Sequence, residues 1–70
     1  MYKTMEEARE RAKEVLARYP GQKIVLMERK LTKRAVYIFY GFRFLINEEF
    51  NSEWKEDDDH SYSRMIEVIQ

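Results

Sequence analysis

The chain has 70 residues, with 13 Lys and Arg against 13 Asp and Glu, so its formal net charge is zero. This length predicts one small domain, residues 1–70, which buries only about 60% of the surface of its unfolded chain. The absence of cysteine excludes disulfide bonds and thiolate metal sites. No apolar run approaches the roughly 18 residues of a membrane-spanning helix, so a cytoplasmic protein is expected, in the host cytoplasm if the source is a phage.

The charge is unevenly distributed along the chain. Residues 1–46 carry eleven Lys or Arg against five Glu, whereas residues 48–59 carry seven acidic residues against Lys55 alone. A chain divided in this way can pair its charges internally, associate with a second copy, or present two charged surfaces to different partners.

An amphipathic helix is predicted near the N-terminus. Thr4 followed three residues later by Glu7 is a capping-box pattern, which marks a helix start. Pro20 and Gly21 end the helix near Arg18 or Tyr19, because Pro disfavours helical geometry in the residue before it. Apolar residues recur at helical spacing along one stripe, formed by Met5, Ala8, Ala12, Val15, Leu16 and Tyr19.

Two strands are predicted next, over residues 22–30 and 35–46, with a turn at 31–34. The second is the longest apolar run of the chain and is expected to be a long, curved central strand. Its alternation places Tyr40, Phe42 and Phe44 on one face and Tyr37, Phe39 and Arg43 on the other. Gly41 in mid-strand indicates a bulge, a bend or the close approach of another group.

The second half of the chain is less regular. Residues 48–54 fit a short helix or another strand equally well, and residues 55–61 are expected to be a solvated loop because they are almost all charged. Residues 62–70 predict a last strand, with Ile66 and Val68 opposed to Met65 and Ile69. The predicted fold class is therefore α+β, with one N-terminal amphipathic helix packed on an antiparallel sheet of three or four strands.

Enzymatic chemistry is not predicted. The chain has one His, and its two glycines are taken by a helix exit and a strand, so we expect no catalytic residues and no cofactor. The run Asp57, Asp58, Asp59 and His60 offers ligands for Mg²⁺, Ca²⁺ or a transition metal. Consecutive loop residues rarely converge on one ion, and a solvated acidic loop is the favoured interpretation.

The feature with the greatest functional content is the strand that is apolar on both faces, because one short helix covers only one face of a sheet. The second face is covered either by Phe50 and Trp54 or by another chain, and Tyr, Phe and Arg are typical of interface centres. We therefore expect a non-enzymatic protein-binding module, a regulator or inhibitor that also self-associates as a homodimer. Its sharper version is a phage-type inhibitor whose acidic segment mimics nucleic acid. The candidate partner-binding residues are Tyr37, Phe39, Arg43, Phe50, Glu53, Trp54, Glu56, Asp57, Asp58 and Asp59.

The alternative is binding of single-stranded nucleic acid. Four basic residues lie at the predicted hairpin tip, next to aromatic residues of the sheet that could stack on bases. They are Arg29, Lys30, Lys33 and Arg34. The neutrality of the whole chain and the acidic run at 48–59 argue against this interpretation, because carboxylates repel phosphate.

Overall fold

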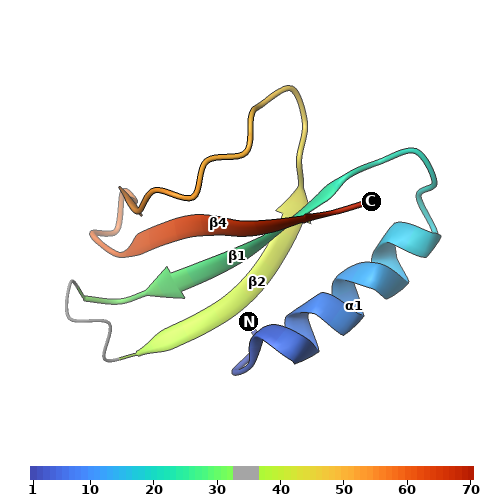
Figure 1. Ribbon diagram of the computed structural model, residues 1–70. Helices are drawn as coiled ribbons and strands as arrows, with labels where there is room; N and C mark the ends of the chain where they lie inside the picture. The colour runs from blue at the N-terminus through green and yellow to red at the C-terminus, as the bar shows by residue number, and fades with distance from the viewer. Residues whose placement is uncertain (33–36) are drawn as a thin grey trace.

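A computed structural model describes residues 1–32 and 37–70. One helix, α1 (Met5–Ala17), packs on an antiparallel sheet, as Figure 1 shows. Within the described residues the sheet has four strands in the order β2-β1-β4-β3, and their bounds are β1 Ile24–Lys30, β2 Ile38–Phe44, β3 Lys55–Glu56 and β4 Tyr62–Ile69. The predicted α+β class is confirmed. No helix in the described part of the chain is long and apolar enough to cross a membrane.

The helix forms as the sequence predicts. The Thr4 hydroxyl accepts a hydrogen bond from the backbone N–H of Glu7 at 3.2 Å, which satisfies one of the free N–H groups of the first turn. Ala8 and Ala12 are fully buried against the sheet, and their small side chains allow α1 to lie close to it. The helix ends before Pro20, and Gly21 leaves it with a φ of +89°. Tyr19 packs edge-to-face on Phe44 of β2, with ring centroids 5.4 Å apart.

The core lies between α1 and one face of the sheet, which we call the helix face. Ile24 and Leu26 of β1 are fully buried there, together with Ile69 of β4. Phe42 and Phe44 of β2 pack against them. The opposite face, which we call the far face, carries Val25, Met27 and the other residues that alternate along the strands with those of the helix face.

The strand predicted to be central lies at the edge of the sheet. β2 pairs with β1 without a break from Ile24 opposite Phe44 to Lys30 opposite Ile38, and the strands with neighbours on both sides are β1 and β4. The outer side of β2 is met by Tyr2, whose backbone N–H and C=O both bond to Tyr40 at 2.8 Å. The prediction was wrong because an apolar run looks the same whether α1 and the N-terminus flank it or two strands do. Residues 35 and 36 of the predicted strand, and 33–34 of the predicted turn, lie outside the described residues.

The bulge lies in β4 and not at Gly41. The pairing of β1 with β4 shifts between Leu26 and Met27, so β4 carries one extra residue there. Beyond this point the two faces of β4 exchange. Ile66 and Ile69 both pack into the core on the helix face, while Val68 lies opposite Val25. The predicted grouping of Ile66 with Val68 was therefore wrong.

Residues 45–54, all of which are described, form neither the helix nor the strand considered from the sequence. Asn47 has a φ of +52°, which turns the chain away from β2, and the Asn51 side chain accepts the backbone N–H of Glu53 at 2.9 Å. These local bonds replace those of a helix. The short strand β3 lies within the region predicted to be loop, where Lys55 pairs with Ser63 and Glu56 with Tyr62.

Candidate protein interface

The chain itself covers part of the far face. Val25 is fully buried and Met65 is 5% exposed. The segment between β2 and β4 runs along the side of the sheet away from α1 (Figure 1), and the backbone N–H of Asn51 donates to the sulfur of Met65 at 3.3 Å. The segment around Asn51 therefore covers the part of the far face over Met65 of β4.

Trp54 lies on the helix face, at the end that α1 does not reach. The Lys30 ammonium lies 4.1 Å from the centroid of its ring and the Arg64 guanidinium 4.9 Å, which are cation–π distances. Phe50 is 42% exposed. The sequence left open whether Phe50 and Trp54 cover the second face of the sheet. Trp54 instead contacts the cations of Lys30 and Arg64 on the helix face, and Phe50 keeps much of its surface in solvent.

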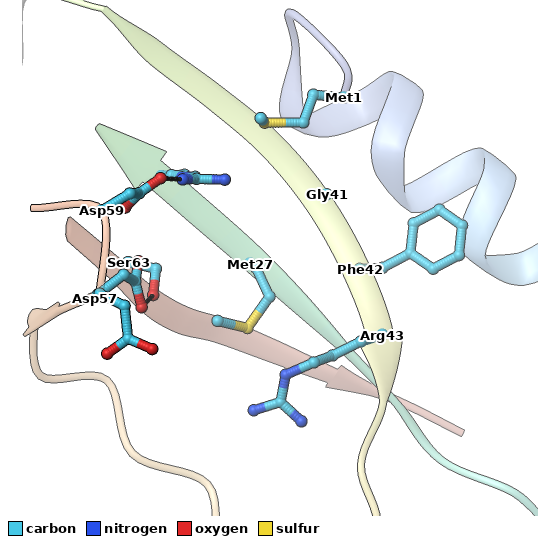
Figure 2. Close-up of a pocket in the computed structure, with 10 residues that line it drawn as sticks. Met1, Met27, Gly41, Phe42, Arg43, Asp57, Asp59 and Ser63 are labelled. Atoms are coloured by element: carbon cyan, nitrogen blue, oxygen red, sulfur yellow. Dashed lines mark hydrogen bonds and ion pairs between the residues drawn. The ribbon is translucent and has the colours of Figure 1, made fainter. Parts of the chain in front are cut away.

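A hollow of about 500 Å³ remains on the far face, over β1 and β2. In Figure 2 the side chains of Met27 and Arg43 point toward it, whereas that of Phe42 points away to α1. We call it the Gly41 hollow, and define it by its lining residues Met1, Met27, Arg29, Gly41, Phe42, Arg43, Asp57, Asp58, Asp59 and Ser63. Its floor is apolar and flexible where the methionines lie, and one side of its rim is acidic.

Gly41 forms the floor of the hollow, and the fold does not require a glycine there. The strand pairing continues unbroken through Gly41, which lies opposite Met27. Its φ is not in the left-handed region, and no described atom beyond its chain neighbours lies within 4 Å of where a Cβ would be. Glycine weakens a strand, and one common reason for it is the close approach of another molecule. Of the three sequence interpretations of Gly41, the bulge is excluded.

The acidic rim is built on a tight turn between β3 and β4. The backbone N–H of Asp57 donates to the C=O of Ser61 at 2.7 Å, and His60 adopts a φ of +65° to close the turn. Ser61 is 3% exposed. Its backbone N–H and its hydroxyl both donate to the Asp59 carboxylate, and Arg29 of β1 donates from Nε to the Ser61 hydroxyl at 3.1 Å. These bonds fix the rim to the sheet.

The two guanidinium groups at the hollow are each engaged by a carboxylate. Arg29 forms an ion pair with Asp59, and Arg43 forms one with Glu48 across the turn after β2. Hydrogen bonds from Arg43 hold the pKa of Glu48 below its ordinary value. The Asp57 carboxylate accepts from the hydroxyl of Ser63 at 3.3 Å and lies 3.4 Å from the hydroxyl of Ser61, whose proton is donated to Asp59. Asp58 is exposed and has no hydrogen bond or ion pair within the described residues, so its carboxylate at the rim faces solvent without a described protein partner.

The Asp59 network predicts a pH dependence of stability. Hydrogen bonds from Ser61, with a smaller contribution from Arg29, lower the pKa of Asp59 below its ordinary value of 3.8. A carboxyl with a lowered pKa stabilises the fold above its unfolded pKa, and this stabilisation is lost as the pH falls through the folded value. The urea midpoint of Asp59→Asn should therefore be below that of the wild type at about pH 7, and the two midpoints should converge below about pH 4.

Asp58→Asn is the matched control for this measurement, because it removes the neighbouring carboxylate that bonds to nothing among the described residues. Its midpoint should follow the wild type at every pH. Equal urea midpoints for Asp59→Asn and Asp58→Asn at neutral pH would contradict the claim that the Asp59 carboxylate stabilises the turn.

The structure brings together some of the residues predicted from the sequence and separates others. Arg43, Asp57, Asp58 and Asp59 line the Gly41 hollow, and Phe39 lies opposite Arg29 on the same face. Glu53 and Arg43 line a smaller neighbouring hollow of about 200 Å³, and Tyr37 is 60% exposed. Glu56 instead faces His60, with 3.3 Å between Oε1 and Nδ1.

The nucleic-acid candidates do not form one surface among the described residues. Arg29 points to Asp59 and Ser61, and Lys30 lies over Trp54. Lys33 and Arg34 lie outside the described residues. Among residues 1–32 and 37–70, no group of three or more His, Asp or Glu side chains is placed to hold a metal ion.

The sequence interpretation missed Met1 and Met27 as parts of the site. Alternation assigns Met27 to the far face, but no local pattern shows which part of that face stays uncovered. A comparison of the chain with protein-family models, with curated proteins and with solved structures found no match. The structure therefore defines only the class of the protein, a small α+β domain with a hollow on the far face of its sheet.

Proposed function

We propose that this protein is a small, non-enzymatic protein-binding module that seats a segment of its partner in the Gly41 hollow and so regulates or inhibits that partner. The observation that carries the proposal is Gly41. A Cβ at this position would meet no described atom within 4 Å, and a residue with a side chain is expected to strengthen the strand, yet a glycine stands here and forms the floor of a hollow. A partner that approaches the strand closely would explain the glycine, because a side chain at position 41 would keep the partner away.

The size and lining of the hollow support a protein ligand. A volume of about 500 Å³ accommodates a few side chains, and the flexible thioethers of Met1 and Met27 adapt to varied shapes. Nucleic acid is the weaker candidate, because both Arg29 and Arg43 are already paired with carboxylates and Asp57 and Asp58 would repel phosphate. A second copy of the chain or a different protein would each satisfy the proposal.

Selection from a library of random linear peptides tests the proposal. The immobilised domain is used for selection and the Gly41→Phe variant for counter-selection, because a Cβ at Gly41 meets no described atom within 4 Å and the phenyl ring beyond it is expected to occupy the hollow. We expect enriched peptides that bind the wild type with micromolar Kd and the variant at least about tenfold more weakly.

The two glycines of the chain allow the bound peptide to be located by amide NMR. The Gly41 signal should shift on binding, whereas the Gly21 signal, from the helix exit, should stay in place. Peptides that bind Gly41→Phe as well as the wild type, or a library that yields none, would contradict the proposed function.

A further inference from the structure

We infer that the segment seated in the Gly41 hollow is basic: a partner chain places the aliphatic stem of a Lys or Arg over Met27 and Gly41 and its cationic head against Asp57 and Asp58. This inference rests on the proposed function and adds the chemistry of the partner. It draws on three features of the hollow, namely its free anions, its occupied cations and its apolar floor.

The unpaired side-chain charges at the hollow are negative, and the α-ammonium group of Met1 is the opposing positive charge among its described lining residues. Arg29 and Arg43 are the two side-chain cations among its lining residues, and each forms an ion pair within the domain. Asp59 is the partner of Arg29, whereas Asp57 is bonded only to hydroxyl groups and Asp58 to no described group. An acidic ligand meets two guanidinium groups that are already paired and the single α-ammonium group of Met1, whereas a basic ligand meets two carboxylates that no cation pairs among the described residues.

The apolar floor suits the stem of a long basic side chain. Lys and Arg bury their methylene groups on apolar surface while the charged head stays near water. Met27 extends from β1 toward the hollow (Figure 2), and Gly41 leaves the neighbouring surface of β2 free of side chain. The acidic turn stands at the rim of this floor, with Asp57 and Asp59 both directed to that side in Figure 2. Floor and rim together match a stem and its head group.

The turn also explains why the anions are held in place. Asp57 and Asp59 both bond to Ser61, which is almost fully buried and is itself tied to β1 through Arg29. The carboxylate of Asp58 is therefore carried by a turn whose backbone is fixed. A cation that binds it does not have to order a flexible loop first, which lowers the entropic cost of association.

The test uses two peptides of alternating charged and Val residues, one with Lys and one with Glu, and the free polyamine spermidine. Binding is followed by NMR of the protein with isotope-labelled methionine methyl groups. Met27 lies in the hollow, while Met5 packs against the core on the helix face and reports any effect elsewhere. We expect the Lys peptide alone to shift the Met27 signal, with Met5 unchanged.

Two variants connect the binding to named groups. Asp58→Asn should raise the Kd of the Lys peptide by up to about fivefold, the usual effect of one exposed ion pair, and added salt should weaken binding to the wild type in the same direction. Gly41→Phe should abolish the shift of Met27. Asp58→Asn is preferred to replacement of all three aspartates because Asp57 and Asp59 also hold the turn.

The outcomes separate the inference from the proposed function. Library peptides that require the open hollow but are acidic or neutral would overturn the basic partner and leave protein binding in place. Spermidine that shifts Met27 with the affinity of the Lys peptide would overturn a protein segment as the occupant. A dimer in sedimentation that Gly41→Phe dissociates would show that a second copy fills the hollow, and would also overturn the inference.

Discussion

Replacement of Leu26 by Ala is expected to lower the free energy of unfolding by about 2–5 kcal/mol, the usual effect of removing a large buried side chain. Leu26 is fully buried on the central strand, beneath α1 and opposite Phe42 of the neighbouring strand. Small domains are stable by only about 5 kcal/mol or little more, so the variant should be partly unfolded in water. Urea titration monitored by the fluorescence of Trp54, the single tryptophan, measures the change.

Leu31→Ala is the matched control, since it makes the same chemical change at a side chain that is 46% exposed. Its free energy of unfolding should stay within about 0.5 kcal/mol of the wild type. If Leu26→Ala does not fold, Ile24→Val gives a milder cut in the same core, with an expected loss of about 0.5–1.5 kcal/mol. Equal urea midpoints for Leu26→Ala and Leu31→Ala would contradict the described core.

Replacement of Gly41 by Val is expected to stabilise the domain while it abolishes binding at the hollow. A glycine inside a strand costs about 0.5–1 kcal/mol relative to residues with a side chain, and nothing described obstructs a Cβ at this position. The free energy of unfolding should therefore rise by about that amount. Most substitutions that abolish binding reduce stability or leave it unchanged, so a gain in stability with a loss of binding is a distinctive result.

Gly21→Val provides the opposite case in the same chain. Gly21 has a φ of +89°, a backbone conformation that disfavours L residues and β-branched residues most of all. This variant should lose about 1–2 kcal/mol of stability, while its binding at the hollow is unchanged. Urea titrations of both variants, together with peptide titrations, make the comparison. A Gly41→Val variant that is less stable than the wild type would mean that the fold itself requires this glycine.

The helix could be predicted in detail because its signals are local. The hydroxyl of Thr4, the buried Ala8 and Ala12 and the exit through Gly21 depend on neighbours within a few residues, and each was found as expected. The three longer strands of the antiparallel sheet also followed from apolar runs and turns, whereas the short strand β3 lies in a segment predicted to be loop. These features need no knowledge of what lies across the sheet.

The position of each strand in the sheet depended on contacts between distant residues. The edge position of β2 follows from the pairing of Tyr2 with Tyr40 and from the insertion of β1 between β2 and β4. The exchange of faces in β4 comes from one extra residue opposite Leu26 and Met27, and alternation alone could not reveal it. Both errors arose where the period of a single strand was taken as evidence for its neighbours.

The candidate site was predicted only in part, because it too depends on contacts between distant residues. The acidic run and Arg43 could be identified from charge and alternation, and they do meet at the hollow. Met27 and Gly41 could be assigned to a face but not to the uncovered part of it, because coverage is decided by residues 45–54. The hydrogen bond from Asn51 to Met65 places this segment on the far face over β4, while the Gly41 hollow over β1 and β2 stays uncovered, and no sequence pattern predicts that contact.

The central position of β1 has a consequence for the newly made chain. α1, β1 and β2 leave the ribosome before β4, which pairs with the other side of β1. Until residues 62–69 emerge, one side of β1 presents unpaired N–H and C=O groups in a strand rich in apolar residues. Such an edge recruits strands from other chains, so the time between the synthesis of β2 and that of β4 is when this protein is most exposed to misassembly.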